Sequence, residues 1–195
     1  MIDHNLVERS ILHISKIKPI EIVPGLYKIQ DVLFPTLLNK LLSFVSTNDL
    51  EWVNEIDPHG RELIRPRKKF NWLPDSPIEE VHTVLESYTA SINKLFDRDN
   101  TFNGISIWKD TVGYQIGPHT DNPIFDVALQ LYLSDNPGIK KATTFYKDDS
   151  VYQFDHVQNT GYIIDNRRKI VHSFTEKIPG NDVRYSLHSV WFKKL

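Results

Sequence analysis

A histidine and an aspartate stand two residues apart in the stretch GYQIGPHTDNPIF, residues 113–125. Residues i and i+2 of a strand point to the same side, so His119 and Asp121 would direct an imidazole and a carboxylate toward one point. Such a pair can provide two ligands of a metal ion. The pair needs support from other residues, because a chain with 8 histidines and 25 acidic residues contains such spacings by chance.

A third ligand would complete a recognisable metal centre. Two histidines and one carboxylate on one face of an iron leave open positions, as in non-haem Fe(II) oxygenases. His172 in KIVHSF is the preferred second histidine, since it follows Asp121 by 51 residues (172 − 121 = 51), enough for the chain to leave and return. His156 in FDHVQN is an alternative, although this stretch looks like a strand end that runs into a turn, and His188 is a third. The remaining histidines lie outside the β-rich half and are interpreted as surface or packing residues: His4, His13, His59 and His82.

An arginine and a serine follow in the stretch NDVRYSLHSVWF, of which RYSLHSVWF reads as the last strand. Arg184 and Ser186 share a face of this strand, and a guanidinium with a hydroxyl two residues on can hold a carboxylate through charge-assisted hydrogen bonds. A buried arginine is costly without an anion, and the strand itself carries no acidic residue. His188 falls on the same face, whereas Trp191 falls off it by strict alternation and would need a bulge to reach a pocket.

The composition narrows the kind of metal site. The chain has 195 residues, 40% of them hydrophobic and 25% charged, which is typical of one ordinary globular domain with a sizeable core. It has no cysteine, which excludes disulfides, thiolate metal sites and cysteine nucleophiles. Any metal is therefore expected on histidine and carboxylate side chains.

Charge and hydropathy indicate where the protein acts. The net charge of −2 gives no overall field that would recruit nucleic acid or a membrane surface. The first residues lack the basic and apolar regions of a signal peptide, and no apolar stretch approaches a membrane span. We therefore predict a cytoplasmic location. The basic stretch RPRKKFNW, residues 65–72, could bind nucleic acid, but a solvated loop, or a mobile lid over the pocket, suits a chain that is not basic overall.

Two helical patterns precede residue 100. Residues 34–46 place leucines and a valine at helical spacing on one face. Residues 76–96 begin with Ser76 as the expected N-cap, Pro77 at the first helical position and Glu79 completing a capping box. A short strand over residues 25–31 is expected before the first helix.

After residue 100 the sequence becomes a series of short β-rich runs separated by turns, typical of a sandwich, jelly roll or barrel with the helices over one outer face. The run VALQLYL puts Leu129 and Leu131 on a face that would pack on the helices. Ala128, Gln130 and Tyr132 fall on the other face, which would line an interior pocket. The expected strands are ISIW, VALQLYL, ATTFY, VYQF, GYIID, KIVHSF and RYSLHSVWF.

The order HTD, then VH about fifty residues on, then RYS twelve residues later (184 − 172 = 12), resembles the Fe(II)- and 2-oxoglutarate-dependent dioxygenases. The local sequence is most similar to their prolyl-4-hydroxylase-like branch. The resemblance covers residues 100–192 in detail, and the N-terminal half in layout only. It is also carried by Tyr114 and Gly117 before the His-x-Asp pair, Tyr132-Leu133 at a strand end, and the run from Arg184 to Trp191-Phe192.

The resemblance implies a fold and a set of site residues. The fold would be mainly β within the α+β class, a double-stranded β-helix (jelly roll) with N-terminal helices packed on one sheet. It would form a single domain over 1–195, with a strand, supporting helices and a variable loop in 1–100 and the jelly-roll core in 101–195. The implied iron ligands are His119, Asp121 and His172, and the implied 2-oxoglutarate contacts are Arg184, Ser186, Tyr132 and Tyr114.

The implied reaction is oxidative decarboxylation of 2-oxoglutarate to succinate with dioxygen, coupled to hydroxylation of a protein residue or a small molecule. Two alternatives stay open. A non-catalytic jelly-roll module could keep a vestigial metal site, and a zinc hydrolase could use the same ligands, although it needs a general base and gives Arg184 no role. The primary substrate and the oligomeric state are not indicated, and substrate contacts are expected in residues 52–75, 108–113 and 174–182.

Overall fold

The computed structural model describes residues 1–47, 52–56, 62–66, 75–111, 113–176, 178–180 and 182–194, with the backbone alone for 52–56 and 62–66. The helices are α1 (His4–Ile14), α2 (Pro35–Thr47), α3 (Pro77–Ser87) and α4 (Thr89–Phe96). The strands are β1 (Ile20–Val23), β2 (Leu26–Gln30), β3 (Trp52–Ile56), β4 (Glu62–Pro66), β5 (Asn100–Asp110), β6 (Ile116–His119), β7 (Val127–Tyr132), β8 (Lys141–Lys147), β9 (Ser150–Asp155), β10 (Thr160–Asp165), β11 (Val171–Phe174) and β12 (Arg184–Lys193).

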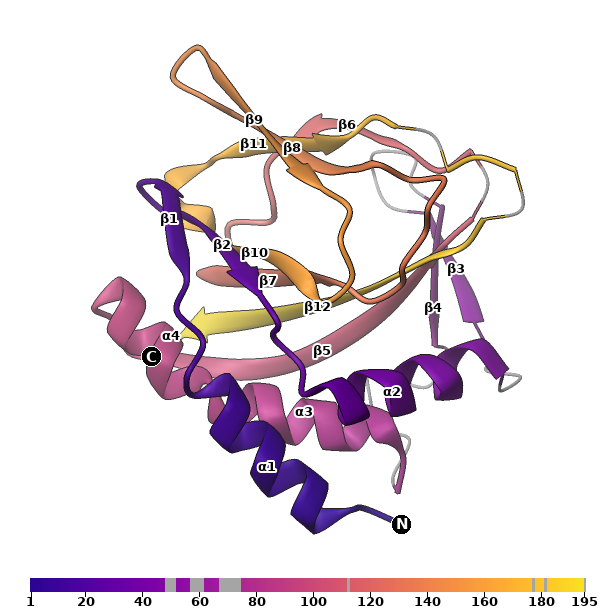
Figure 1. The fold of residues 1–195 in the computed structure, drawn as a ribbon. Helices are drawn as coiled ribbons and strands as arrows, with labels where there is room; N and C mark the ends of the chain where they lie inside the picture. The colour runs from indigo at the N-terminus through magenta and orange to yellow at the C-terminus, as the bar shows by residue number, and fades with distance from the viewer. Residues whose placement is uncertain are drawn as a thin grey trace.

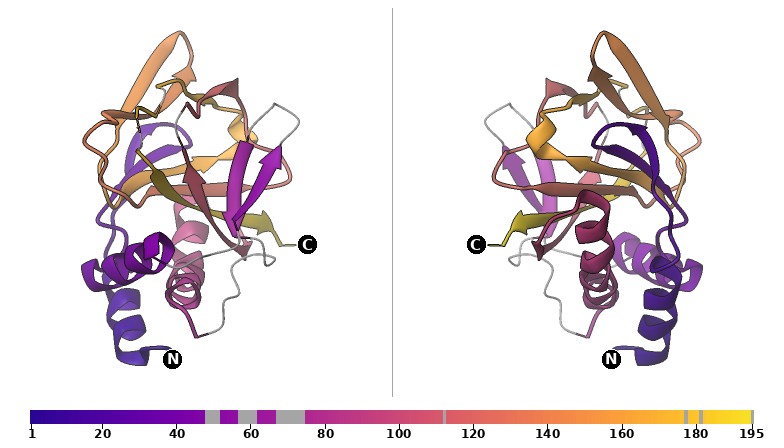
Figure 2. Two further views of the ribbon diagram at one scale, coloured as in Figure 1. Left: turned by 90° about the vertical axis from the view of Figure 1, so that its right-hand side faces the viewer. Right: turned by 90° about the vertical axis from the view of Figure 1, so that its left-hand side faces the viewer.

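The strands form two antiparallel sheets, one above the other in Figure 1. The larger sheet has the order β1-β2-β10-β7-β12-β5-β4-β3, and the smaller has the order β6-β11-β8-β9. The four helices lie against the outer face of the larger sheet, on the side away from the smaller one (Figure 2). The jelly-roll fold predicted from the sequence, with helices packed on one sheet, is confirmed.

Alternation along β7 divides the interior into two regions, as the sequence indicated. Leu129 and Leu131 belong to the main apolar core, which also contains the buried faces of the four helices. Ala128 and Tyr132 belong to a second cluster between the two sheets, and Gln130 lines a pocket there. Burial of one strand face under helices therefore leaves the opposite face for the inter-sheet space.

The tryptophan near the end of β12 lies on the helix side. The pairing of β12 with β5 shifts between Val190 and Trp191, which is the bulge that a pocket position would have required. Trp191 is nonetheless fully buried in the main core, where its indole N–H donates to Thr89 Oγ1 at 3.1 Å. It does not line the pocket.

The N-terminal half departs from the sequence prediction in several places. Helix α1 and strand β1 were not predicted. The single helix expected over residues 76–96 is divided at Tyr88 into α3 and α4. Ser87 and Thr89 each donate a side-chain hydrogen bond to a carbonyl one turn earlier, an interaction that bends helices.

The start of α3 also differs in detail. Ser76 is the N-cap residue and Pro77 begins the helix, as expected, but the Ser76 side chain makes no capping hydrogen bond. The Glu79 carboxylate accepts the backbone N–H of Asp75 at 2.8 Å rather than that of Ser76, so the predicted capping box does not form.

Part of the segment expected to be a variable loop forms a hairpin. Strands β3 and β4 pair with each other, and β4 joins the edge of the larger sheet through Ile64 opposite Lys109 of β5. Arg65 and Pro66 of the stretch RPRKKFNW thus belong to a strand, so the loop prediction is wrong for them, and residues 67–72 lie outside the described part of the chain.

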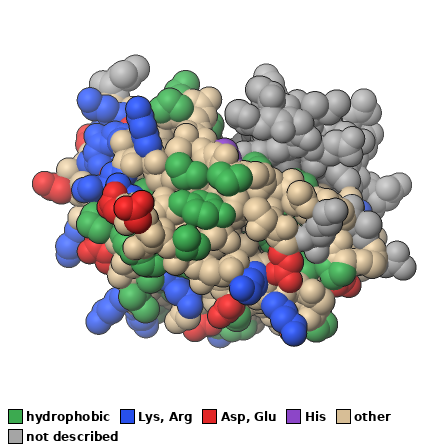
Figure 3. Space-filling view, turned by 90° about the horizontal axis from the view of Figure 1, so that it is seen from above, with side chains coloured by type: hydrophobic (Ala, Val, Ile, Leu, Met, Phe, Trp, Pro, Cys, Tyr) green, Lys and Arg blue, Asp and Glu red, His purple; other side chains and the backbone are tan. Residues whose placement is uncertain are grey.

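The surface carries charges of both signs. Seen from above, hydrophobic side chains gather near the centre of the visible face, Lys and Arg are frequent at one end, and acidic side chains lie among them (Figure 3). Within the described segments, no helix is both long enough and apolar enough to cross a membrane.

Gly161 on β10 lies so close to the backbone of the neighbouring strand β7 that a side chain would not fit there. A Cβ added there would lie 1.8 Å from the carbonyl oxygen of Gln130, a pocket residue on the neighbouring strand. We expect Gly161→Ala to lower the free energy of unfolding by about 1–3 kcal/mol or more, because the backbone must shift. Denaturant titration measures this. Gly117→Ala, whose added Cβ has no described atom within 4 Å, is the control and should change stability little.

Candidate functional site

Three potential metal ligands come together where β6 pairs with β11 and where the chain leaves β6. In the antiparallel pairing of β6 with β11, His119 stands directly opposite His172, with ring centroids 4.4 Å apart. Asp121 follows β6 by two residues, and its Oδ1 lies 3.5 Å from Nε2 of His172. One ligand atom from each of the three side chains lies within 4.8 Å of the others. The structure thus brings together the three residues that the sequence proposed as ligands.

Backbone carbonyls fix both imidazole rings. Nδ1 of His119 lies 2.9 Å from the carbonyl of Gly117, and Nδ1 of His172 lies 3.3 Å from that of Ile170. In each case the carbonyl is two residues earlier in the chain. A carbonyl beside Nδ1 favours the tautomer with the proton there, and leaves the Nε2 lone pair for a metal.

The aspartate is held in its charged form. Burial would raise the pKa of the Asp121 carboxyl, but the hydrogen bond and charge of His172, with the charges of His188 and His119, hold this pKa well below its usual range. A carboxylate beside two imidazole rings is a donor set that suits iron or zinc. The residues present therefore fit a divalent metal.

The alternative ligand His156 lies in a different environment. Its Nε2 is 3.0 Å from the carbonyl of Ser134, and its ring packs against Tyr132. Burial lowers its pKa to about 4, so it is a neutral packing histidine. His188, the third alternative, lines the pocket with its ring edge-on to Trp108, and it is not part of the three-residue group.

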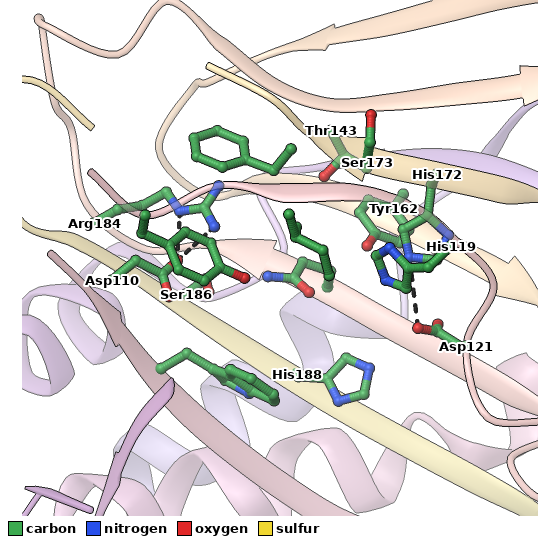
Figure 4. A pocket seen from close by; sticks show the side chains of 15 residues that line it. Asp110, His119, Asp121, Thr143, Tyr162, His172, Ser173, Arg184, Ser186 and His188 are labelled. Atoms are coloured by element: carbon green, nitrogen blue, oxygen red, sulfur yellow. Dashed lines mark hydrogen bonds and ion pairs between the residues drawn. The ribbon is translucent and has the colours of Figure 1, made fainter. Parts of the chain in front are cut away.

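A pocket between the sheets extends from these ligands. Its empty space, with the open mouth included, is about 580 Å³. Figure 4 shows the three ligands at one end, and Arg184 with Asp110 at the other. The pocket is lined by Trp108, Asp110, Tyr114, Ile116, His119, Asp121, Gln130, Thr143, Tyr162, His172, Ser173, Phe174, Arg184, Ser186 and His188.

The arginine at the far end is already paired. Arg184 stands opposite Asp110 in the pairing of β12 with β5, and its Nε and Nη2 both donate to Asp110 Oδ2, at 2.8 and 2.5 Å. Both side chains are buried, at 4% and 3% exposure. Burial alone would lower the pKa of the guanidinium, but the charge and hydrogen bond of Asp110, together with the nearby Tyr114 and Tyr132, outweigh burial and raise that pKa. No acidic residue stands on the strand of Arg184, as expected, and the counter-ion comes from the adjacent strand β5.

Aromatic rings complete the surroundings of the guanidinium. Its central carbon lies 3.8 Å from the centre of the Phe174 ring and 5.6 Å from that of Tyr114. Tyr114 stacks on Phe174 with a centroid distance of 6.0 Å and lines the pocket. Stacking on an aromatic face suits the planar guanidinium and keeps it in one orientation.

Of the two other residues predicted to contact the cosubstrate, Ser186 lines the pocket and Tyr132 does not. Ser186 lines the pocket, and its hydroxyl is buried without a hydrogen-bond partner among the described residues. Tyr132 does not line the pocket, because its hydroxyl donates to Thr143 Oγ1 at 2.8 Å and accepts the Thr143 N–H at 3.3 Å. Thr143 lines the pocket in its stead, on the opposite sheet.

The sequence did not identify Thr143 and Tyr162 as pocket residues, and it gave Asp110 only within residues 108–113, a range expected to contact substrate, without pairing it with Arg184. Alternation on β5 puts Trp108 and Asp110 on one face, which is a usable signal once the strand is placed beside β12. Thr143 and Tyr162 lie on strands whose inward faces depend on the pairing of the sheets, and no local pattern identifies them.

Comparisons with known proteins agree on the fold. Neither a protein-family model nor a curated protein matches the sequence. The structure is similar to that of a prolyl-4-hydroxylase from Pseudomonas putida, with 14% identity, a TM-score of 0.58, and coverage of 98% of this chain and 97% of that one. It is similar to an oxidoreductase of the 2OG-Fe(II) oxygenase family from Burkholderia pseudomallei, with 11% identity, a TM-score of 0.66, and coverage of 100% and 94%.

A third similar structure is HygX from Streptomyces hygroscopicus with nickel, 2-oxoglutarate and hygromycin B bound, with 12% identity, a TM-score of 0.62, and coverage of 87% and 83%. At such identities the similarity establishes the fold. The chain therefore has the fold of solved 2-oxoglutarate oxygenases, and its own chemistry rests on the residues of its pocket.

The three ligands give the first site prediction. We expect His119→Ala, Asp121→Ala and His172→Ala each to weaken Fe(II) binding at least about a hundredfold, because each removes a direct ligand and loss of a supporting residue already costs 10–100-fold. Anaerobic titration with metal analysis measures the affinity. His156→Gln is the matched control, because it changes a buried histidine outside the group. Loss of metal in His156→Gln with retention in His172→Ala would contradict the assignment.

Proposed function

We propose that this protein is an Fe(II)- and 2-oxoglutarate-dependent oxygenase. The observation that carries the proposal is the convergence of two histidines and one carboxylate at one end of a pocket whose other end holds a buried arginine. A metal site alone would suit many reactions. The arginine at the opposite end adds a place for a second carboxylate, as a 2-oxo dicarboxylic acid requires.

At the metal end, three side chains would bind the metal and the backbone would hold them in place. His119, Asp121 and His172 would bind Fe(II), which supplies open positions for the 2-oxo acid and for dioxygen. The carbonyls behind both imidazoles would keep the rings in place when the metal is exchanged. The protein contributes orientation and exclusion of water, and the redox chemistry belongs to the iron and its cosubstrate.

The distal carboxylate of 2-oxoglutarate would bind at the other end. Arg184 would donate from Nη1, which has no hydrogen bond to a described residue, and the Ser186 hydroxyl would donate beside it. Tyr114 would line this end with Phe174. We assign Tyr132 an indirect role, since its hydroxyl positions Thr143, which faces the pocket.

The reaction would couple decarboxylation of 2-oxoglutarate to hydroxylation of a primary substrate, either a protein residue or a small molecule. Similar folds serve both classes: one similar structure is described as a prolyl-4-hydroxylase and another holds hygromycin B. The pocket mouth is open to substrate, and we assign the catalytic unit to a single domain over residues 1–195. The cytoplasmic location stays a prediction.

A second candidate function is supported by the Arg184–Asp110 pair. In a non-catalytic jelly-roll module with a vestigial metal site, the arginine would need no ligand, because Asp110 already neutralises it. The zinc hydrolase has no comparable support, since it leaves Arg184 and Ser186 without a role.

Turnover separates these functions. With Fe(II) bound, we expect succinate to form from 2-oxoglutarate only when dioxygen is present, and to be suppressed by an oxoglutarate analogue that cannot decarboxylate. Succinate is measured by mass spectrometry in the presence of a library of peptides and small molecules. Asp121→Ala, which loses a metal ligand, is the inactive control. Conversion of a library compound that continues without dioxygen and without succinate would point to the hydrolase, and the absence of succinate and of any conversion to the vestigial module.

Arg184 tests the cosubstrate assignment. Arg184→Lys keeps the charge but loses the planar fork, so 2-oxoglutarate binding should weaken while iron remains bound. Replacement by leucine should weaken it more, by about 2–5 kcal/mol if the pair with the ligand is fully desolvated. The leucine is combined with Asp110→Asn, so that no charged carboxylate is left buried without its arginine.

The measurement is an anaerobic titration of the Fe(II) protein with 2-oxoglutarate, followed by the visible absorption of the chelate. Arg98→Lys, which changes an arginine paired with the buried Asp165 elsewhere, is the matched control and should bind the cosubstrate normally. Unchanged affinity after loss of the Arg184 guanidinium would remove the support for 2-oxoglutarate.

A further inference from the structure

The guanidinium of Arg184 is used on one edge only. Asp110 accepts from Nε and Nη2 through a single oxygen, Oδ2. Nη1 makes no hydrogen bond to a residue of the described segments, and a guanidinium offers five N–H donors in a fixed fork. The edge that includes Nη1 is therefore available to a ligand while Asp110 keeps the other edge.

The guanidinium at this end of the pocket already has a carboxylate partner before any ligand binds. Among the described residues that line the pocket, Arg184 is the one lysine or arginine, and Asp110 is its buried carboxylate partner. A dicarboxylate that binds here places a second carboxylate on the same guanidinium. Two carboxylates that share one site repel each other, and burial strengthens the repulsion because the surroundings have a low dielectric constant.

We infer that Asp110 is a positioning and specificity-determining residue of the cosubstrate pocket, which fixes the Arg184 guanidinium and at the same time limits its affinity for dicarboxylates. The inference rests on the proposed function. The two effects come from different properties of the side chain. Orientation needs only an oxygen acceptor opposite Nε, whereas the limit on affinity needs the negative charge.

Asparagine separates these properties. In Asp110→Asn the amide oxygen can still accept from Nε, but the competing charge is gone. We expect 2-oxoglutarate to bind at least about tenfold more tightly to this variant, since a like charge next to the ligand is removed and Arg184 gains an anion that it lacks in the free variant. Asp110→Ala loses the acceptor as well and should bind less tightly than Asp110→Asn, because the guanidinium is no longer fixed.

The experiment compares two ligands on the metal-loaded protein under anaerobic conditions. 2-Oxoglutarate carries the distal carboxylate, and pyruvate has the same 2-oxo acid end without it. Tightening should be confined to 2-oxoglutarate, so the change in selectivity between the two acids reports on Asp110 directly. A merely structural role would alter the binding of both acids together.

Asp165→Asn is the matched control. Asp165 is also buried, at 1% exposure, and is paired with an arginine through Nη1 and Nη2 of Arg98 at 3.0 and 2.6 Å. It lies outside the pocket lining, so its loss should lower stability without changing the selectivity between the acids. If Asp110→Asn does not fold, Asp110→Ser, which keeps a small oxygen acceptor without charge, takes its place.

The outcomes separate this inference from the function on which it rests. Binding of 2-oxoglutarate that is unchanged or weaker in the folded, metal-loaded Asp110→Asn would overturn the role of Asp110 alone. Failure of the wild type and all variants to bind either acid, with metal in place, would overturn the proposed function as well. Tighter and selective binding of 2-oxoglutarate by Asp110→Asn would support both, even if binding by the wild type is too weak to measure.

Discussion

The larger sheet must bury one of its faces under the helices. This requirement determines which side chains point into the space between the two sheets. On β12, Leu187 packs into the main core, whereas Arg184 and Ser186 face the pocket. A slip of one residue in the pairing would exchange these faces. It would place a guanidinium in an apolar core, where an unpaired charge is very unfavourable. The register that builds the core therefore also builds the chemistry of the pocket.

The two ends of the pocket solve different physical problems. At the metal end, Nδ1 of each imidazole lies beside a carbonyl two residues earlier in the chain, so the backbone itself orients both rings. At the other end, a buried guanidinium keeps its charge, because its pKa is too high for it to lose a proton. It therefore needs a counter-ion at all times, and β5 supplies one in Asp110.

Sequence reasoning reached the features that depend on local pattern or on the order of motifs. The alternation in VALQLYL gave the two faces of β7, and the order of HTD, VH and RYS gave residues that the fold brings around one pocket. It could not pair Asp110 with Arg184, because residues 110 and 184 meet only through the register of two strands far apart in the chain. It could not place Tyr132 either. The inward side chains of β7 point either into the pocket or into the packed cluster beside it. Tyr132 belongs to the cluster, where its hydroxyl is hydrogen-bonded to Thr143 on the opposite sheet.

Arg184 and Asp110 compensate each other's buried charge even if the pocket binds no ligand. A ligand is therefore indicated only by the polar atoms beside this pair. The Ser186 hydroxyl is buried at 1% exposure and has no partner in the described part of the chain. A buried hydroxyl without a hydrogen bond destabilises the folded state, and native interiors contain few of them. An apolar side chain at this position would not have that cost. The hydroxyl is thus understandable where a ligand supplies the missing partner, which favours a pocket that is occupied during function over one that has lost its use.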